Sequence, residues 1–394
     1  MSFALNLLPT AVGSLPHTDP VAACDLIRRV LPEIPIWPQL PRRSFRENMY
    51  AQYSEGFPGV VLDEAGERSW VDRSQDLSPA LERLYAAYLE NDLDFAAISP
   101  EYAAGLYTLL GKWGIRESGN QEISESANQR IGESANQQIS KSAIENRKSK
   151  IENRQSPISN LQSPIAIKGQ VTGPISWGLT VTDENRRPVL YDEVLADAVA
   201  KHLRLKAAWQ ERELRKLAPQ TIIFVDEPYM SAYGSAFVAI DRDLVVSLLS
   251  ETMAGIQGLG GVHCCGNTDW SILLETPMDI LNFDAYGYAE SLALYPEAVH
   301  AFLRRGGAIA WGIVPALEEE AIWRESVASL TERLVAAMHL LVKKGIPLDD
   351  LLAACLVTTS CGLRGRTVAA AERALELVAG VAREMRRRYG GTGG

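Results

Sequence analysis

The sequence predicts an α/β protein whose parallel strands close into a single (β/α)8 TIM barrel. Short apolar runs alternate with amphipathic segments along the chain, and this alternation is typical of a parallel sheet covered by helices. Polar residues stand at or just after the ends of several runs. A barrel gathers such residues from many strands at one end, whereas an open sheet draws its site from fewer strands. These residues are Ser14, Gln39, Asp226, His263, Asp284 and Cys361.

Nine apolar runs are predicted to be strands, which is one more than the barrel needs. We expect the surplus run to be 95–98, which would pair locally beside the barrel. Predicted helices include 195–217, 242–256, 295–305 and 326–344. No G-x-G-x-x-G follows the first strand, so the usual dinucleotide site is excluded. The nine runs are 10–14, 36–39, 95–98, 165–168, 221–225, 261–263, 280–283, 308–311 and 354–357.

One stretch, residues 118–162, does not share this pattern. It contains no aromatic residue and repeats short words, with Glu-Ser-Ala-Asn-Gln starting at 125 and again at 133. So few apolar residues cannot bury enough surface to offset the entropy lost on ordering. We expect a barrel over residues 1–394 that carries 118–162 as a disordered loop insertion. A short coiled-coil arm is the alternative.

Composition limits the classes of function. Of 394 residues, 46% are hydrophobic and 22% are charged, as in soluble globular proteins. A net charge of −10 argues against a binder of nucleic acid or of membrane surfaces, since both need a basic face. Residues 1–9 do not resemble a signal peptide, and no apolar run is long enough for a membrane span. Five cysteines do not suggest a disulfide framework, so we expect a cytoplasmic protein with free thiols.

The most informative motif is Gly260-Gly-Val-His-Cys-Cys-Gly266, at the end of a predicted strand. His263 and Cys265 are two residues apart, so in an extended chain both side chains lie on one face and can reach one metal ion. Cys361 ends another apolar run and offers a third soft ligand. Two thiolates and one imidazole favour Zn2+, and three protein ligands with an open position are typical of a catalytic zinc that binds a substrate thiol. The alternative is a packed histidine beside ordinary buried thiols.

Two acidic residues are further candidates. Asp284 ends a strand about twenty residues after Cys265, where it would be a fourth, displaceable metal ligand or a cap for the next helix. Asp226 lies in Val225-Asp-Glu-Pro228, and because neighbouring strand residues face opposite sides, only one of the two acids need face the barrel mouth. A buried carboxylate requires a partner. For Asp226, that partner would be the ammonium of an amino-acid substrate or an internal arginine.

The first predicted strand ends in Gly13 and Ser14, and the glycine would let backbone amides approach a substrate carboxylate, although an ordinary turn is the alternative. Lys168-Gly-Gln-Val-Thr-Gly-Pro174 predicts a sharp loop near the same rim. Together with Val225-Asp-Glu-Pro228, His263-Cys-Cys265 and Cys361-Gly-Leu-Arg364, these motifs resemble the catalytic half of cobalamin-independent methionine synthase. His263 to Gly266 is also similar to the zinc motif of the corrinoid-dependent coenzyme M methyltransferases, which belong to the uroporphyrinogen decarboxylase superfamily.

This resemblance implies a zinc-dependent methyl transfer to the thiol of homocysteine, which forms methionine. The implied zinc ligands are His263, Cys265 and Cys361, with Asp284 at the position of a glutamate in the family. The implied homocysteine contacts are the backbone at Gly13 and Ser14 and the carboxylate of Asp226, which we expect to be the catalytic residue. Glu47 is the candidate for a further acidic contact.

The full-length folate-dependent enzymes resemble two fused barrels, and this chain has room for only the second. We therefore expect a methylcorrinoid protein or methylcobalamin to be the methyl donor, rather than methyl-folate. Three alternatives remain at this stage. They are transfer to another thiol such as coenzyme M on the same zinc, a porphyrin-type decarboxylase that needs no zinc, and a carrier of metal or of a corrinoid protein that is not an enzyme.

Overall fold

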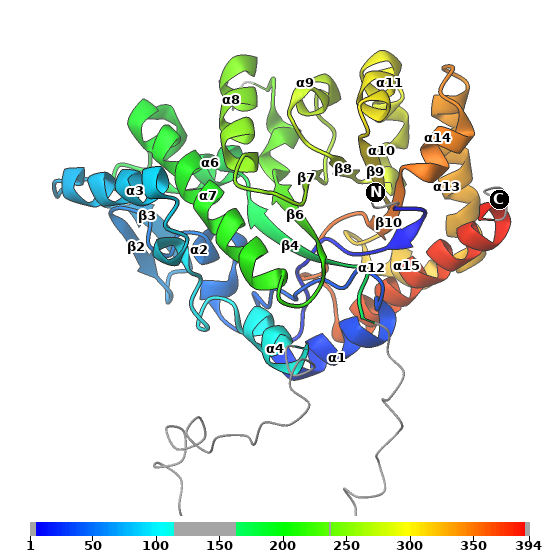
Figure 1. The fold of residues 1–394 in the computed structure, drawn as a ribbon, viewed down its shortest axis with the longest axis horizontal. Helices are drawn as coiled ribbons and strands as arrows, with labels where there is room; N and C mark the ends of the chain where they lie inside the picture. Colours follow the sequence, from blue (N-terminus) through cyan, green and yellow to red (C-terminus); the bar gives the residue numbers. More distant parts are fainter. Residues whose placement is uncertain (1–4, 114–162, 236–237, 391–394) are drawn as a thin grey trace, which may run out of the picture.

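The protein is described by a computed structural model, which places residues 5–113, 163–235 and 238–390. The chain forms an α/β fold around a curled sheet of seven strands, with helices on its outer side (Figure 1). The strand order is β1-β10-β9-β8-β7-β6-β4, and every neighbouring pair is parallel. The strands are β1 (Leu8–Pro9), β4 (Ala166–Thr172), β6 (Gln220–Asp226), β7 (Leu259–Cys264), β8 (Ile280–Phe283), β9 (Ala308–Val314) and β10 (Cys355–Thr359).

Six of the predicted strands, from 165–168 onward, overlap strands of this sheet, and β8 has the predicted bounds. The run 10–14 was placed too late, since β1 covers only residues 8–9 and is followed by a single bridge at Ser14. The surplus run was correctly left out of the sheet. Its expected local pairing is wrong, because residues Asp94–Ala96 form a 3-10 helix instead.

The segment 36–39 connects the two edges of the curled sheet. Ile36 forms a parallel bridge with Lys168 of β4, and Gln39 forms one with Ser14, beyond β1. The segment makes only isolated bridges within the described chain, and not the continuous strand that the apolar run predicted. Pro35 and Pro38 explain the difference, because proline lacks the amide hydrogen that a continuous ladder requires.

The predicted helices are present, with ends shifted by a few residues. For example, α7 packs against β4 and β6, α13 against β9, and α15 against β10. The described helices are α1 (Pro20–Val30), α2 (Met49–Gln52), α3 (Ser78–Glu90), α4 (Ala104–Trp113), α6 (Pro174–Thr180), α7 (Glu193–Leu214), α8 (Arg242–Met253), α9 (Trp270–Glu275), α10 (Ala285–Leu292), α11 (Pro296–Arg304), α12 (Glu319–Arg324), α13 (Val327–Val342), α14 (Leu348–Ala353) and α15 (Val368–Tyr389).

The core has two parts, and the alternation of side chains along each strand separates them. On β6, Ile222 and Phe224 belong to a small cluster on the concave side of the sheet, whereas Ile223 and Val225 belong to the large cluster under the helices. The small cluster also takes residues from β1, β4, β8, β9 and β10. Apolar side chains therefore fill one level of the concave side, and the polar side chains lie closer to the carboxyl ends of the strands.

A second, three-stranded sheet was not predicted. It consists of β2 (Val60–Asp63), β3 (Arg68–Val71) and β5 (Thr182–Asp183), in the order β2-β3-β5. Among the described residues, no helix is both long enough and apolar enough to cross a membrane. The predicted insertion at 118–162 lies outside the described residues.

Candidate metal centre

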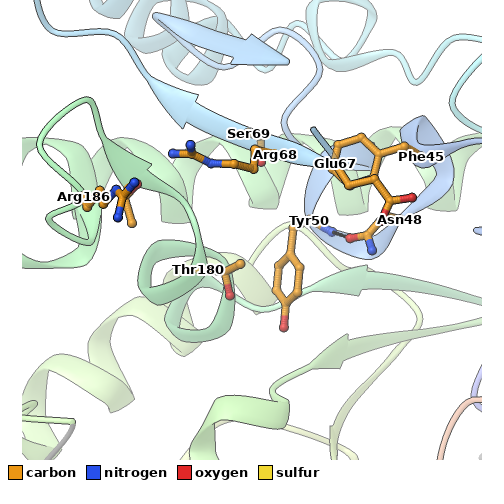
Figure 2. Close-up of a pocket in the computed structure, with 9 residues that line it drawn as sticks. Phe45, Asn48, Tyr50, Glu67, Arg68, Ser69, Thr180 and Arg186 are labelled. Carbon is orange, nitrogen blue, oxygen red and sulfur yellow. Dashed lines mark hydrogen bonds between the residues drawn. The ribbon is translucent and has the colours of Figure 1, made fainter. Parts of the chain in front are cut away.

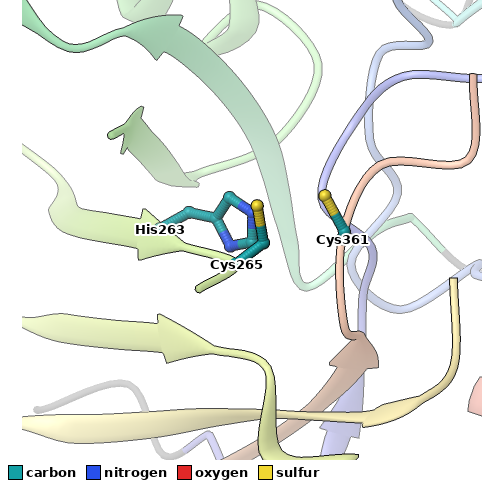
Figure 3. Close-up of side chains that lie close together, drawn as sticks. All are labelled: His263, Cys265 and Cys361. Atoms are coloured by element: carbon teal, nitrogen blue, oxygen red, sulfur yellow. The ribbon is translucent and has the colours of Figure 1, made fainter. Parts of the chain in front are cut away.

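Three side chains from two distant parts of the chain meet at the carboxyl ends of the sheet strands. His263 lies in β7, Cys265 follows that strand directly, and Cys361 follows β10. The ligand atoms of the three residues all lie within 4.8 Å of one another (Figure 3). His263 is buried and the two thiols are partly buried. A buried group of one imidazole and two thiols can bind a metal such as zinc.

The pairing of the strands explains why His263 faces the concave side. Thr172 of β4 pairs with Asp226 of β6, Asp226 pairs with His263, and His263 pairs with Asn282 of β8. Directly paired residues point to the same face of a sheet, so these four side chains form one row. Cys264 points the other way, into the core under the helices, as the alternation of the strand predicted.

The orientation of the His263 ring is determined by Asn282, a residue that was not singled out from the sequence. Nδ1 of His263 lies 2.6 Å from Oδ1 of Asn282. The amide nitrogen of Asn282 donates to the carbonyl of Ala310 and to the hydroxyl of Thr358, each at 2.8 Å. Oδ1 is therefore the acceptor, Nδ1 carries the proton, and Nε2 keeps its lone pair for a metal. Such partners of a ligating histidine are common in metal sites.

The two thiols of the group are electrostatically unequal. A hydrogen bond donated by Cys361 lowers the pKa of Cys265 to about 4, against the opposing effect of burial. Its role as donor to Cys265, reinforced by burial, raises the pKa of Cys361. One thiolate and one thiol thus share a proton in this pair. A divalent metal would favour both thiolates, since it binds the deprotonated form.

Asp284 caps the helix that follows β8. Its Oδ1 accepts a hydrogen bond of 2.8 Å from the amide of Gly287, at the start of α10. The side chain is buried, and burial raises its pKa to about 6, with a further contribution from Cys265. Asp284 therefore lies near the three-residue group without being part of it. Its role as a fourth metal ligand stays a prediction.

The adjacent acids Asp226, the last residue of β6, and Glu227, which follows it, point in opposite directions. Glu227 faces the helices, where it accepts hydrogen bonds from the amides of Ile175 and Ser176 at the start of α6, and from the Ser176 hydroxyl. Asp226 faces the concave side, and its Oδ1 has no hydrogen-bond partner among the described residues. Burial raises the pKa of Asp226 to about 6, although His263 and Lys168 oppose this rise.

The Gly13–Ser14 segment lies directly beside the Cys361 segment. The carbonyl of Ser14 accepts a hydrogen bond of 2.9 Å from the amide of Leu363. A Cβ added to Gly362 would lie 2.2 Å from the Ser14 hydroxyl, so this hydroxyl would have to turn away. The amide hydrogens of Gly13 and Ser14 donate to no acceptor in the described ranges. They are thus available to a ligand.

A second residue that was not recognised from the sequence as functional is Lys168. Its side chain is fully buried, and its Nζ donates to the carbonyl of Val12 at 2.6 Å and lies 4.1 Å from the ring centre of Phe224. Burial lowers the pKa of Lys168 to about 7, against an opposing effect of Asp226. The signal in the sequence was a lysine inside an otherwise apolar run. Its contact anchors the backbone just before Gly13.

Glu47 already has partners within the protein. Its carboxylate accepts from the amide of Leu40 at 3.1 Å and from the guanidinium of Arg43 at 2.6 Å. The side chain is buried, at the end of the 3-10 helix Phe45–Glu47 that directly precedes α2. A contact between Glu47 and a substrate stays a prediction.

A cavity of about 480 Å³ lies between the small sheet and the segment that contains α2 (Figure 2). Two arginines of the small-sheet region, Arg68 and Arg186, line it, together with Tyr50 of α2. None of the predicted site residues lines this cavity. It is lined by Phe45, Asn48, Tyr50, Glu67, Arg68, Ser69, Thr180, Thr182 and Arg186.

No protein-family model and no curated protein matches the chain. Among solved structures, it is similar to a B12-independent methionine synthase from Shewanella sp. W3-18-1 in complex with selenomethionine, with 17% identity, a TM-score of 0.41, and coverage of 64% of this chain and 69% of that one. It is also similar to a methyltransferase from Methanosarcina mazei, with 14% identity, a TM-score of 0.39, and coverage of 61% and 62%.

Proposed function

We propose that this chain is a zinc-dependent methyltransferase that moves a methyl group to the thiol of homocysteine and so forms methionine. The proposed donor is a methylcorrinoid protein or methylcobalamin. One observation supports this function above all others. Three soft ligand atoms lie within 4.8 Å of one another, and one of them belongs to His263. His263 pairs with Asp226 on the neighbouring strand, whose buried carboxylate oxygen has no partner in the described chain.

In this proposal, the metal is held by Nε2 of His263 and by the sulfur atoms of Cys265 and Cys361. Asp284 is the proposed fourth ligand, which would give way to the substrate thiol. Zn2+ in such a site supplies positive charge that favours the thiolate form of a bound thiol at neutral pH.

The chain's own groups would hold the rest of homocysteine. Asp226 accepts from the ammonium, and the unpaired amides of Gly13 and Ser14 donate to the carboxylate. The Lys168 contact with Val12 and the packing of Gly362 on Ser14 keep those amides next to Cys361. The sulfur then attacks the methyl carbon of the donor, which retains the electron pair of the broken bond.

The proposal takes the fold to be a (β/α)8 barrel that spans residues 1–394. Segment 36–39 would occupy the eighth strand position, and 118–162 would be an insertion in a loop. This arrangement gives the site the usual position of a barrel active site, at the carboxyl ends of the strands.

The test measures zinc content and methyl transfer from methylcobalamin to homocysteine, with and without a chelator. Wild-type protein is expected to contain stoichiometric zinc, and the chelator should abolish transfer. Cys361→Ser should lose both zinc and activity. Cys24→Ser is the matched control, because Cys24 is a buried thiol that donates to the carbonyl of Gly105, away from the metal group. Full transfer by metal-free Cys361→Ser protein would rule the proposal out.

The same assay separates thiol acceptors. Asp226 should favour an amino-acid thiol over coenzyme M, which carries a sulfonate and no ammonium. If coenzyme M is methylated faster than homocysteine, the zinc site stands but the assignment of the acceptor is wrong.

A further inference from the structure

Three buried polar atoms beside the candidate metal centre lack a hydrogen-bond partner in the described part of the chain. They are Oε1 of Gln170, Oγ1 of Thr172 and Oδ1 of Asp226. The residues are 0%, 1% and 7% exposed, respectively. Buried polar groups in folded proteins are nearly always paired, so an unpaired set indicates a missing partner.

The strand geometry brings these atoms to one place. Gln170 and Thr172 are two residues apart on β4, so their side chains share a face. Thr172 pairs with Asp226 on β6, and Asp226 pairs in turn with His263 on β7. The three side chains therefore line the concave side next to the metal group.

One of these residues, Gln170, also lies close to the Gly13–Ser14 backbone, which is proposed to bind the substrate carboxylate. Oε1 and Cδ of Gln170 lie 2.5 Å from the position that a Cβ on Gly13 would take. The amide nitrogen of Gln170 faces the carbonyl of Trp37 at 3.4 Å, so the oxygen is its free end. Gln170 thus lies between Gly13 and the row that contains Asp226.

The chemistry of the set limits what can bind. All three atoms can accept hydrogen bonds, and one carries negative charge when ionised. Lys168 faces the same side of the sheet, but its ammonium donates to Val12. The matching group has positive charge and three N–H bonds on one compact centre, which describes a primary ammonium.

We propose that Gln170, Thr172 and Asp226 form a socket that accepts the three N–H bonds of a substrate ammonium, so that Gln170 and Thr172 determine specificity for amino-acid thiols. This inference rests on one part of the proposed function, which is that the ligand is a thiol bound to a metal at His263, Cys265 and Cys361. A thiol without an ammonium leaves three buried acceptors unpaired, and sites of this kind reject such analogues strongly.

The test uses full-length protein loaded with Co2+ and follows thiol binding by the sulfur-to-cobalt absorption band, without any methyl donor. The two probes are homocysteine and 4-mercaptobutanoate, which has the same thiol, chain and carboxylate but no amine. Wild type should bind homocysteine roughly a hundredfold more tightly. Thr172→Val and Gln170→Met, which keep side-chain volume, should each reduce this preference roughly tenfold, by weakening homocysteine alone.

Two further variants sharpen the result. Thr252→Val removes a buried hydroxyl that already bonds to the carbonyls of Ala200 and Leu248 in the helix layer, and it should leave the preference unchanged. Gln170→Glu adds a charged acceptor and should increase the preference. If Thr172→Val or Gln170→Met fails to fold, the Gln170→Glu variant still tests the socket.

Each remaining outcome has a definite meaning. Equal affinity of wild type for the two probes, or equal weakening of both probes in the variants, overturns the socket and assigns the unpaired atoms to buried water. If neither thiol changes the absorption band, the proposed function and the socket are overturned together. A retained preference for homocysteine with no methyl transfer overturns the proposed reaction and supports the socket.

Discussion

His263 and Asn282 lie side by side on β7 and β8, and the 2.6 Å contact between Nδ1 and Oδ1 directs Nε2 of the imidazole toward Cys265 and Cys361. Asn282 cannot rotate freely, because its amide nitrogen donates to Ala310 and Thr358. A buried amide in the sheet thereby determines which ring nitrogen is available to a metal.

The first prediction concerns this contact. Asn282→Ala should weaken zinc affinity roughly ten- to hundredfold, because the ring loses both its orientation and the acceptor that keeps the proton on Nδ1. Thr358→Val should have a smaller effect, since the carbonyl of Ala310 still orients the amide. Competition with a chelating dye measures both variants. Zinc affinity equal to that of wild type in Asn282→Ala would show that the contact does not position the ring.

The second prediction concerns the contact between the two loops at the site. In Gly362→Ala, the new methyl group would displace the Ser14 hydroxyl, since the two would otherwise be 2.2 Å apart. We expect the dissociation constant for homocysteine to rise several-fold, with zinc retained. Gly365→Ala is the matched control in the same loop, because a Cβ there would meet no atom within 4 Å. Identical thiol binding by the two variants would contradict the prediction.

The third prediction concerns Lys168, which anchors Val12 ahead of Gly13. Lys168→Met removes this contact and should weaken homocysteine binding several-fold while zinc content stays constant. Lys206 is a suitable control, because it is also fully buried and donates to a backbone carbonyl, that of Ala97. Lys206→Met should leave thiol binding unchanged. Thiol titrations of the cobalt-substituted proteins distinguish the two cases.

The fourth prediction concerns stability against pH. Burial, with a smaller contribution from Lys206, lowers the pKa of His202 from its ordinary value of 6.5 to about 3. The neutral ring therefore stabilises the fold above pH 6.5, and this contribution is lost as the pH falls from 6.5 toward 3. The loss from this group should be about 1.4 kcal/mol per pH unit across that window.

Urea unfolding of metal-free wild type and of His202→Leu between pH 7.5 and pH 4 measures this effect. The variant also loses the bond of 3.0 Å between the ring and the carbonyl of Tyr53, so its stability at pH 7.5 should be lower. The test is the slope, which should be shallower in the variant by one bound proton. Parallel curves would assign the acid sensitivity to other groups.

The candidate metal group could be anticipated because the evidence for two of its three residues is local. Two ligands at i and i+2 of a strand must share a face, and a strand end places them at the rim. Cys361 was identified by its position at the end of another strand. Asn282 could not be recognised in the same way, because an asparagine within Ile280–Phe283 acquires its partners only from the register of neighbouring strands.

The fold, too, was predictable from the sequence where the evidence is local, and not where it depends on distant segments. Short, mainly apolar runs predicted the buried strands from β4 onward well, whereas the bounds of the first strands depended on prolines and on pairing between distant segments. The small sheet escaped prediction because β5 has two residues and pairs with β3, more than a hundred residues earlier. Likewise, Gln170 and Thr172 became relevant only once their lack of partners was visible.

The proximity of Cys265 and Cys361 has a consequence for how the protein withstands oxidants. Their sulfur atoms lie within 4.8 Å of each other, and the thiolate character of Cys265 makes it the more reactive of the two. A small closing movement would suffice for a disulfide that ties the loop after β7 to the loop after β10. A metal bound by both sulfur atoms would protect them from oxidation, and a disulfide between them could no longer bind the metal. Metal loss and oxidation would therefore reinforce each other.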